Sequence, residues 1–166
     1  PTKLGQQHNP HRQCLDDTET RVVGLRHRLE NVAIIKDVTY INDSKATNLD
    51  SVSVAIQSFN KPVVLILGGR NKGADFRLLL PHIKSSHVRD IISYGEAGGQ
   101  ISTAIGDAVR SVQVTDLNSA VTTAQRLAAP GDVVLLSPGC ASFDQFANFE
   151  ERGQYFKTKV MEMMAA

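Results

Sequence analysis

The sequence predicts an α/β protein, a three-layer sandwich whose sheet is mostly parallel with an antiparallel hairpin at one edge. Strand and helix patterns alternate along most of the 166 residues, which is typical of parallel strands joined by right-handed crossovers. Residues 62–67 form a nearly continuous apolar run, as expected of a strand covered on both faces. Polar turns rich in glycine or serine follow the predicted strands, so we expect a ligand site where the strands end.

Composition narrows the class of protein. With 42% hydrophobic residues, the chain is long enough for one domain with a sizeable core. The 18 Lys and Arg residues nearly balance 17 Asp and Glu residues, so we expect no nucleic-acid partner. No apolar run approaches the roughly 20 residues of a membrane span, so we expect a cytoplasmic monomer without a membrane partner. The spacing of the Cys and His residues predicts neither a disulfide nor a metal site.

The first elements predict a tail followed by an edge hairpin. Residues 1–20 are polar, and we interpret residues 1–23 as a tail or the remnant of an upstream central domain, with the folded domain at 24–166. Residues 32–35 and 38–41 are apolar and are separated only by Lys36 and Asp37. Two strands joined so closely must be antiparallel.

The second of these strands ends in a polar cluster, residues 42–48. A helical pattern follows, and either Thr47 or Asn48 is placed to cap its first turn. One acid, Asp43, and one ammonium group, Lys45, suit a ligand with both anionic and cationic parts. A capped turn in which Asp43 and Lys45 face solvent explains the same pattern equally well.

The rest of the chain continues the alternation. The further predicted strands are residues 62–67, 88–94, 111–114 and 132–136. The predicted helices pass through Phe76–Ile83, Ile101–Ile105, Ala120–Leu127 and a last segment that is opened by Asn148 and buries Phe156, Val160, Met163 and Met164. These elements make a Rossmann-like sandwich, in which the loops after Ile41, Leu67, Tyr94 and Leu136 emerge at one edge.

The chemistry at this edge indicates binding rather than catalysis. Lys45 and Lys72 offer ammonium groups, Thr47 and Ser142 offer hydroxyls, and Arg28 offers a guanidinium suited to phosphate. The sequence contains no phosphate-binding loop, dinucleotide fingerprint or serine nucleophile elbow. Cys140 is expected to be a buried structural residue. We therefore expect the chain to hold a substrate and to contain no catalytic residue of its own.

Three stretches resemble the D-glutamate-adding Mur ligases, the UDP-N-acetylmuramoyl-L-alanine:D-glutamate ligases. They are residues 42–48 (NDSKATN), 67–76 (LGGRNKGADF) and 136–153 (LSPGCASFDQFANFEERG). Residues 24–30 (GLRHRLE) match the segment that leads into the family's C-terminal domain, where the third position is more usually proline. The run DSKATN separates these ligases from their sister Mur ligases, and the resemblance extends from Gly24 to the C-terminus.

The resemblance implies part of an enzyme of peptidoglycan synthesis. Such ligases act in the cytoplasm and use ATP and Mg²⁺ to make an acyl phosphate that the amino group of D-glutamate attacks. They have three domains, and this chain resembles the third. Because the phosphate-binding loop belongs to the central domain, the resemblance implies that this segment needs the upstream domains as partners and is inactive alone.

The family also implies a role for each matching residue. Its glutamate-binding positions correspond here to Thr47, Lys72, Ser142, Phe143 and Phe149. Its nucleotide-facing positions correspond to Arg28, Asp43 and Lys45. Neither a metal ligand nor a catalytic residue is implied within the chain, since ATP and Mg²⁺ are bound mainly by the central domain.

Alternatives remain open. One is an L-glutamate-specific or folylpolyglutamate synthase-like ligase domain, and another is a stand-alone ligand-binding module derived from one. Position 143 is Phe where some family members have leucine, a difference that bears on the choice between D- and L-glutamate. Residues 4–9 faintly resemble the Gly-x-His-Asn helix start of the family's central domain, but Pro10 and Arg12 depart from it, so we expect no adenine-binding role there.

Overall fold

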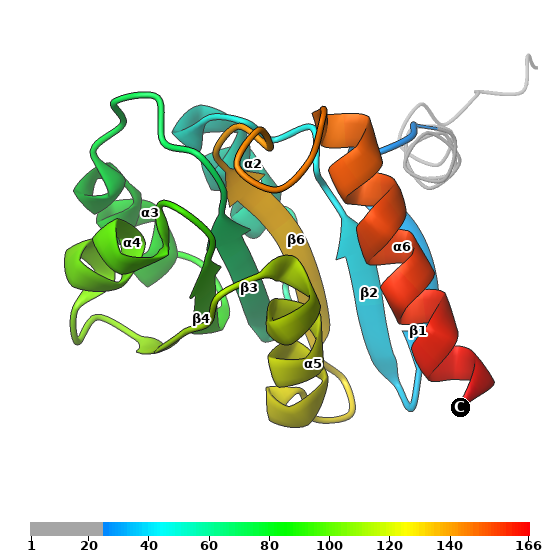
Figure 1. Ribbon diagram of the computed structural model, residues 1–166. Helices are drawn as coiled ribbons and strands as arrows, with labels where there is room; N and C mark the ends of the chain where they lie inside the picture. Colours follow the sequence, from blue (N-terminus) through cyan, green and yellow to red (C-terminus); the bar gives the residue numbers. More distant parts are fainter. Residues whose placement is uncertain (1–24) are drawn as a thin grey trace, which may run out of the picture.

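A six-stranded sheet forms the middle layer of the computed structural model, which describes residues 25–166 (Figure 1). The predicted tail, residues 1–23, lies outside the described residues. The strand order is β1-β2-β6-β3-β4-β5, with β1 antiparallel to β2 and all other neighbours parallel. The strands are β1 (Glu30–Ile35), β2 (Val38–Asn42), β3 (Val63–Gly68), β4 (Val88–Tyr94), β5 (Arg110–Gln113) and β6 (Val133–Gly139). The predicted fold class is confirmed, including the hairpin at the edge.

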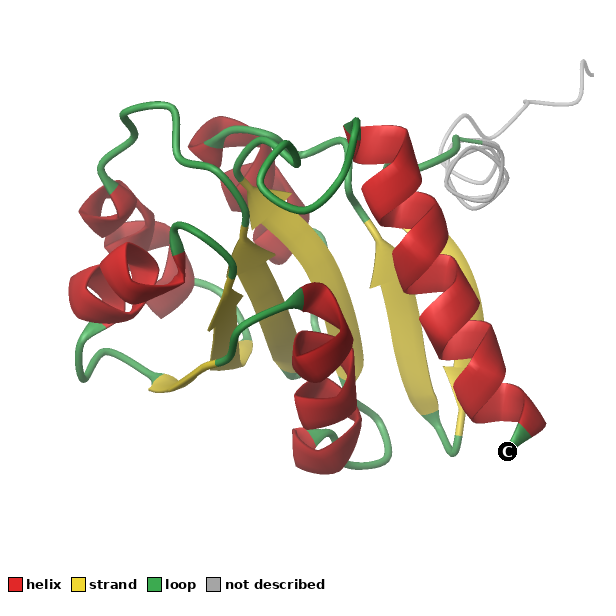
Figure 2. Cartoon of the chain, viewed as in Figure 1, coloured by secondary structure: helices red, strands yellow, loops and turns green. Residues whose placement is uncertain are grey.

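Helices cover both faces of the sheet, and Figure 2 shows α5 and α6 in front of the strands. The helical segments are α2 (Leu49–Gln57), the 3-10 helix η1 (Phe76–Leu79), α3 (Leu80–Lys84), α4 (Gly98–Ile105), α5 (Leu117–Leu127) and α6 (Phe149–Ala165). In β3, Leu65 faces the core shared with α2, α3 and α4, whereas Ile66 faces the core shared with α5 and α6. Alternate side chains of a strand point to opposite faces, so a nearly continuous apolar strand fills two cores.

Side chains at the helix starts fix where the loops end. Asn48 accepts a hydrogen bond from the Ser51 N–H at 2.9 Å, so Asn48 rather than Thr47 caps α2. Asn148 caps α6 in the same way, through the Glu151 N–H at 2.7 Å. Because Asn48 caps the first turn of α2, the Thr47 side chain is not needed as a helix cap.

Three predicted boundaries were wrong. The helix predicted through Phe76–Ile83 divides into η1 and α3, with Pro81 in the first turn of α3, where a residue without an N–H is tolerated. Strand β6 continues past Leu136 to Gly139, which pairs with Gly68 beyond a register shift in β3. Met164 is 48% exposed, because it lies in the last turn of α6, and the buried stripe ends with the partly buried Met163.

The parallel strands bring their following loops to one end of the molecule. In Figure 1 the loops after β2, β3 and β6 gather at the top, above the ends of these strands. These segments are far apart in sequence but adjacent in space, since β6 lies between β2 and β3. The predicted convergence of the loops on one rim is therefore confirmed.

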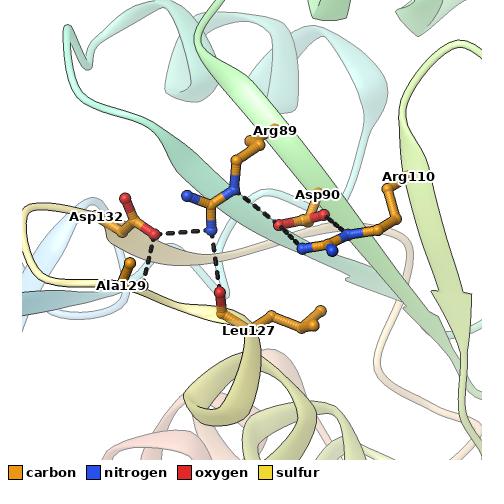
Figure 3. Close-up of polar contacts among 6 residues, drawn as sticks. All are labelled: Arg89, Asp90, Arg110, Leu127, Ala129 and Asp132. Carbon is orange, nitrogen blue, oxygen red and sulfur yellow. Dashed lines mark hydrogen bonds and ion pairs between the residues drawn. The ribbon is translucent and has the colours of Figure 1, made fainter.

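A cluster of paired charges lies near the opposite ends of the strands (Figure 3). The Asp90 carboxylate is 1% exposed and accepts hydrogen bonds from Arg89, at 3.0 Å, and from Arg110. Arg89 also pairs with Asp132 at 2.7 Å. Burial alone would raise the pKa of Asp90, but the hydrogen bonds from Arg110 and Arg89 lower it below its ordinary value of 3.8.

This pairing predicts a stability effect for Asp90→Ala. We expect a loss of about 2–4 kcal/mol in the free energy of unfolding at pH 7, because two guanidinium groups lose their buried carboxylate. The pKa of Asp90 is lowered on folding, so its contribution is complete above 3.8 and is lost as the pH falls through the native value. Urea unfolding at pH 7 and at pH 2 to 3 measures both effects.

Asp75→Ala is the matched control, because Asp75 pairs with Arg77 at the surface and both side chains are largely exposed. Its loss at pH 7 should be much smaller than that of Asp90→Ala, because solvent screens this exposed pair. Equal losses for the two variants would contradict the stabilising role of the Asp90 cluster.

Candidate functional site

The loop after β2 forms one wall of a cavity of about 470 Å³ at the rim. The turn of residues 27–29 and the first turns of α2 form the other walls. The cavity brings together four of the predicted site residues, Arg28, Asp43, Lys45 and Thr47. Arg28 and Lys45 are exposed, so two cationic groups are available to an anionic ligand, while Asp50, from α2, adds a negative charge to the same lining.

Asp43 is the buried member of this group, with an exposed fraction of 5%. One carboxylate oxygen accepts a hydrogen bond from the Leu29 N–H at 3.1 Å, and the other accepts from the Ser137 hydroxyl at 2.7 Å. Burial raises the pKa of Asp43 to about 6, against the opposing effects of Ser137, Leu29 and the nearby Arg28. The alternative in which Asp43 simply faces solvent is therefore wrong, although Lys45 is exposed.

A second group of predicted residues lies on the loops after β3 and β6. Ser142 is buried, and its carbonyl accepts hydrogen bonds from the turn that follows it. Phe143, in contrast, is 55% exposed. Phe149 is partly buried at the start of α6, and its carbonyl accepts a hydrogen bond from the Ser44 hydroxyl at 2.7 Å. Lys72 is exposed on the loop after β3.

Backbone contacts join the loops that hold this second group. Arg70 and Ala141 exchange two hydrogen bonds, of 2.8 and 3.0 Å, in an antiparallel bridge. A Cβ atom at Gly69 would lie 2.3 Å from the Ala141 carbonyl oxygen, so only glycine allows this approach. The bridge brings the loop of Lys72 beside the loop of Ser142.

A buried arginine joins the two groups of loops. Arg152, on α6, is 0% exposed and donates to the Ser44 hydroxyl at 2.9 Å, the Ser44 carbonyl at 2.8 Å and the Cys140 carbonyl at 2.9 Å. Desolvation lowers the pKa of this guanidinium below its ordinary value. Sequence reasoning gave Arg152 no role, although it lies four residues before Phe156 and eight before Val160, on the buried stripe of α6.

A polar network ties the turn of residues 27–29 to the same helix. The Asn42 amide donates to the Glu30 carboxylate at 3.1 Å and lies 2.9 Å from His27 Nδ1. Lys157, on α6, donates to the other oxygen of Glu30 at 2.9 Å. The His27 ring also packs edge-on against Phe149, with ring centroids 6.2 Å apart. Sequence reasoning missed this network, because its members are separated by up to 127 residues.

Nucleophilic chemistry at Cys140 is disfavoured by its surroundings. Cys140 is 1% exposed, and burial raises the pKa of its thiol to about 12. The expectation of a buried structural cysteine is confirmed. Among residues 25–166, no group of three or more His, Cys, Asp or Glu side chains is arranged to hold a metal, and no helix is long and apolar enough to cross a membrane.

Comparison with known protein families decides the family. Residues 27–140 match the family described as Mur ligase, glutamate ligase domain, which is more than two thirds of the chain. The chain belongs to the Mur ligase family. The matched part of this Mur ligase domain includes the residues that line the cavity at the rim and the loop of Arg70, and it ends at residue 140, just after β6.

Curated relatives of this Mur ligase domain are longer proteins. A UDP-N-acetylmuramoylalanine–D-glutamate ligase from Chlamydia caviae is 49% identical over 139 residues, which is 84% of this chain and 33% of the relative. A protein of the same name from Salinibacter ruber is 45% identical over 85% of this chain and 31% of the relative. The chain thus spans about a third of the length of the curated relatives it matches.

Solved structures share the fold at low identity. UDP-N-acetylmuramate-alanine ligase from Thermotoga maritima superposes with a TM-score of 0.59 at 12% identity, covering 98% of this chain and 34% of that one. Bifunctional folylpolyglutamate synthase/dihydrofolate synthase from Yersinia pestis gives 0.57 at 19% identity, covering 86% and 32%. At these identities the likeness concerns the fold alone.

Removing the Arg152 side chain should destabilise the protein strongly. We expect Arg152→Ala to lower the free energy of unfolding by about 3–5 kcal/mol, because two carbonyls and a hydroxyl lose their buried donor and a cavity is left. Arg126→Ala, at an exposed position of α5, is the control and should change it by about 0.5 kcal/mol or less. Urea unfolding measures the stability of both variants. A loss below about 1 kcal/mol for Arg152→Ala would contradict the conclusion that Arg152 joins the two groups of loops.

Neutralising Asp43 should stabilise the protein at neutral pH. The pKa of this acid is raised on folding from 3.8 to about 6, so its favourable contribution is present below 3.8 and is lost as the pH rises through 6. At pH 8 the buried carboxylate therefore opposes folding by about 2–3 kcal/mol. Asp43→Asn should raise the free energy of unfolding by about 1–3 kcal/mol at pH 8 and flatten its change between pH 4 and 6. Thermal unfolding at several pH values measures this effect. The same pH dependence of stability in the wild type and in Asp43→Asn would contradict the expectation.

Proposed function

We propose that this chain is the substrate-holding C-terminal domain of an ATP-dependent ligase that adds D-glutamate to UDP-N-acetylmuramoyl-L-alanine in peptidoglycan synthesis. The observation that supports this most is the identity of 43–50% to curated D-glutamate ligases, over 80–84% of the chain. The whole enzyme would act in the cytoplasm as a monomer, together with upstream domains that supply the phosphate-binding loop.

Glutamate would bind on the rim through its two negative charges. Lys72 and Thr47 would hold carboxylate oxygens at one end, while Ser142 and the backbone near Phe143 and Phe149 would hold the other end. A ligand fixed at two separate points is measured for its length, and a third contact is needed to measure its handedness. Phe143 is 55% exposed, which supports its ring as that third contact and as a part of the choice between D- and L-glutamate.

The nucleotide would bind at the cavity beside the turn of residues 27–29. The residues present fit a phosphate-bearing ligand, because Arg28 and Lys45 are exposed cations beside an open space of about 470 Å³. Bound ATP and Mg²⁺ supply the phosphoryl group that activates the acceptor carboxylate. Within this chain, Arg28 and Lys45 would orient the nucleotide, and Asp43 would fix the local backbone and accept a hydrogen bond from it.

The alternative of a folylpolyglutamate synthase-like ligase domain has weaker support. Folylpolyglutamate synthase is related to this chain through the fold alone, at 19% identity, whereas the curated relatives that share the rim sequence are D-glutamate ligases. The choice between D- and L-glutamate and the choice between a ligase domain and a stand-alone module are both open to direct measurement.

An NMR titration of the labelled 166-residue chain tests the binding assignment. D-glutamate should shift the signals of Thr47, Lys72, Ser142 and Phe149, and L-glutamate should shift them much less, because the two anchors and the contact with Phe143 together fix handedness. ATP should instead shift Arg28 and Lys45. In Lys72→Ala we expect the response to D-glutamate to weaken about tenfold or more, since a charge-assisted contact of at least about 1.4 kcal/mol is lost.

Lys84→Ala is the matched control, because Lys84 is an exposed lysine on α3, away from the rim loops. Its titration should equal that of the wild type. Equal responses to D- and L-glutamate would contradict the proposed stereochemistry, and equal responses of the two lysine variants would contradict the role of Lys72.

A further inference from the structure

Arg28 lies in a turn whose backbone is strained on both sides. His27 has φ 63° and Leu29 has φ 44°, so two residues that are not glycine adopt left-handed conformations around the arginine. Such conformations are unfavourable for residues that carry a side chain. The turn therefore persists only because its surroundings hold it, and its direction decides where the Arg28 guanidinium points.

Hydrogen bonds from three directions hold this turn. The His27 N–H donates to the Glu30 carboxylate at 3.2 Å, and the His27 carbonyl accepts from the Lys45 N–H at 2.9 Å. On the other side of Arg28, the Leu29 N–H donates to the Asp43 carboxylate at 3.1 Å. The carboxylate of Asp43 is therefore the contact that fixes the turn immediately after Arg28.

The Asp43 carboxylate is held in turn by the side chain of Ser137. Ser137 lies in β6 and is 0% exposed, and its hydroxyl donates to the second carboxylate oxygen of Asp43 at 2.7 Å, across 94 residues of sequence. The other groups facing Asp43 are the Leu29 amide and the Arg28 guanidinium on the turn. Lys45, from the loop after β2, and Asp50, from the first turn of α2, line the same cavity.

We propose that Ser137 is a positioning residue for nucleotide binding, which orients the Asp43 carboxylate and through it the Leu29 amide and the direction of Arg28. The inference rests on the proposed nucleotide-facing role of Arg28. Ser137 reaches the ligand only through Asp43, so its removal should act on the ionisation and direction of its neighbours. An ionised, correctly oriented carboxylate is the better acceptor for the Leu29 amide.

The first part of the test follows the Asp43 carboxyl carbon by NMR during a pH titration of the 166-residue chain. In the wild type we expect a midpoint near pH 6. In Ser137→Ala the midpoint should rise by about one pKa unit, since the hydrogen bond that favours the charged form is lost. Ser137→Cys keeps the size of the side chain with a weaker donor and should give an intermediate midpoint.

Ser93→Ala is the matched control. Ser93 lies near the end of β4, is also 0% exposed, and its hydroxyl has no hydrogen-bond partner among the described residues. Its removal should leave the Asp43 midpoint unchanged. An Asp43 midpoint that is the same in the wild type, Ser137→Ala and Ser137→Cys would overturn the inference.

The second part titrates the same proteins with MgATP and follows the Arg28 side-chain N–H and the Leu29 amide. At pH 6, where about half of the Asp43 carboxyls are ionised in the wild type and about a tenth in Ser137→Ala, the affinity of Ser137→Ala should be about fivefold lower than that of the wild type. The difference should shrink toward pH 8.5, where Asp43 is ionised in both proteins, and a general loss of structure would not show this pH profile. Equal affinities at every pH would overturn the positioning role.

A wild-type chain in which MgATP leaves Arg28 unaffected would remove the nucleotide-facing assignment, and with it the positioning role. The Asp43 titration distinguishes this result from a failure of the Ser137 contact. A midpoint that moves in Ser137→Ala shows the contact to be present even when no nucleotide binds.

Discussion

The positions of the rim loops depend on the buried guanidinium of Arg152. It donates to the loop after β2 at Ser44 and to the loop after β6 at Cys140, and it is anchored in α6. None of these hydrogen bonds is made to a carboxylate, so the positive charge is compensated mainly by oxygen dipoles. Such a group is costly to bury and therefore persists only when its geometry is fully satisfied. Its planar array of donors sets the distance between two loops that are nearly a hundred residues apart in sequence.

Asp43 fixes the local backbone but opposes folding at neutral pH. Its carboxylate is buried beside Ser137 and the Leu29 amide, and its pKa is raised to about 6, so at neutral pH the ionised group opposes folding. The same carboxylate fixes a turn with two left-handed residues, His27 and Leu29. Strain and an unfavourable charge thus occur together at the cavity, as expected where local geometry serves ligand binding rather than stability.

Much of the fold could be predicted because its signals are local. The apolar run of β3, the tight turn at Lys36 and Asp37 and the cap at Asn148 each act within a few residues, and each was found. The extension of β6 to Gly139 was not found, since it depends on pairing with Gly68.

Contacts across the sheet account for most of what sequence reasoning missed at the site. Ser137 and Asp43 are neighbours only because β6 pairs with β2. The local turn pattern suited a solvent-facing acid as well as a buried one, and only the packing of β6 decides between them. Arg152 is the exception, because a single arginine on the apolar stripe of α6 already indicates a buried cation that needs several acceptors.

The buried carboxylates near the starts of the strands are paired with arginines, whereas three exposed cations at the rim are not paired with any described residue. Near the starts of the strands, Arg89 and Arg110 are paired with Asp90 and Asp132, so their charges serve the fold. At the rim, the exposed cations Arg28, Lys45 and Lys72 form no ion pair among residues 25–166. In the proposed binding role, unpaired cations held on loops that Arg152 and the Arg70–Ala141 bridge make rigid are preorganised for an anionic ligand. The ligand then replaces water without having to order the loops, and specificity follows from the fixed distances between the cations.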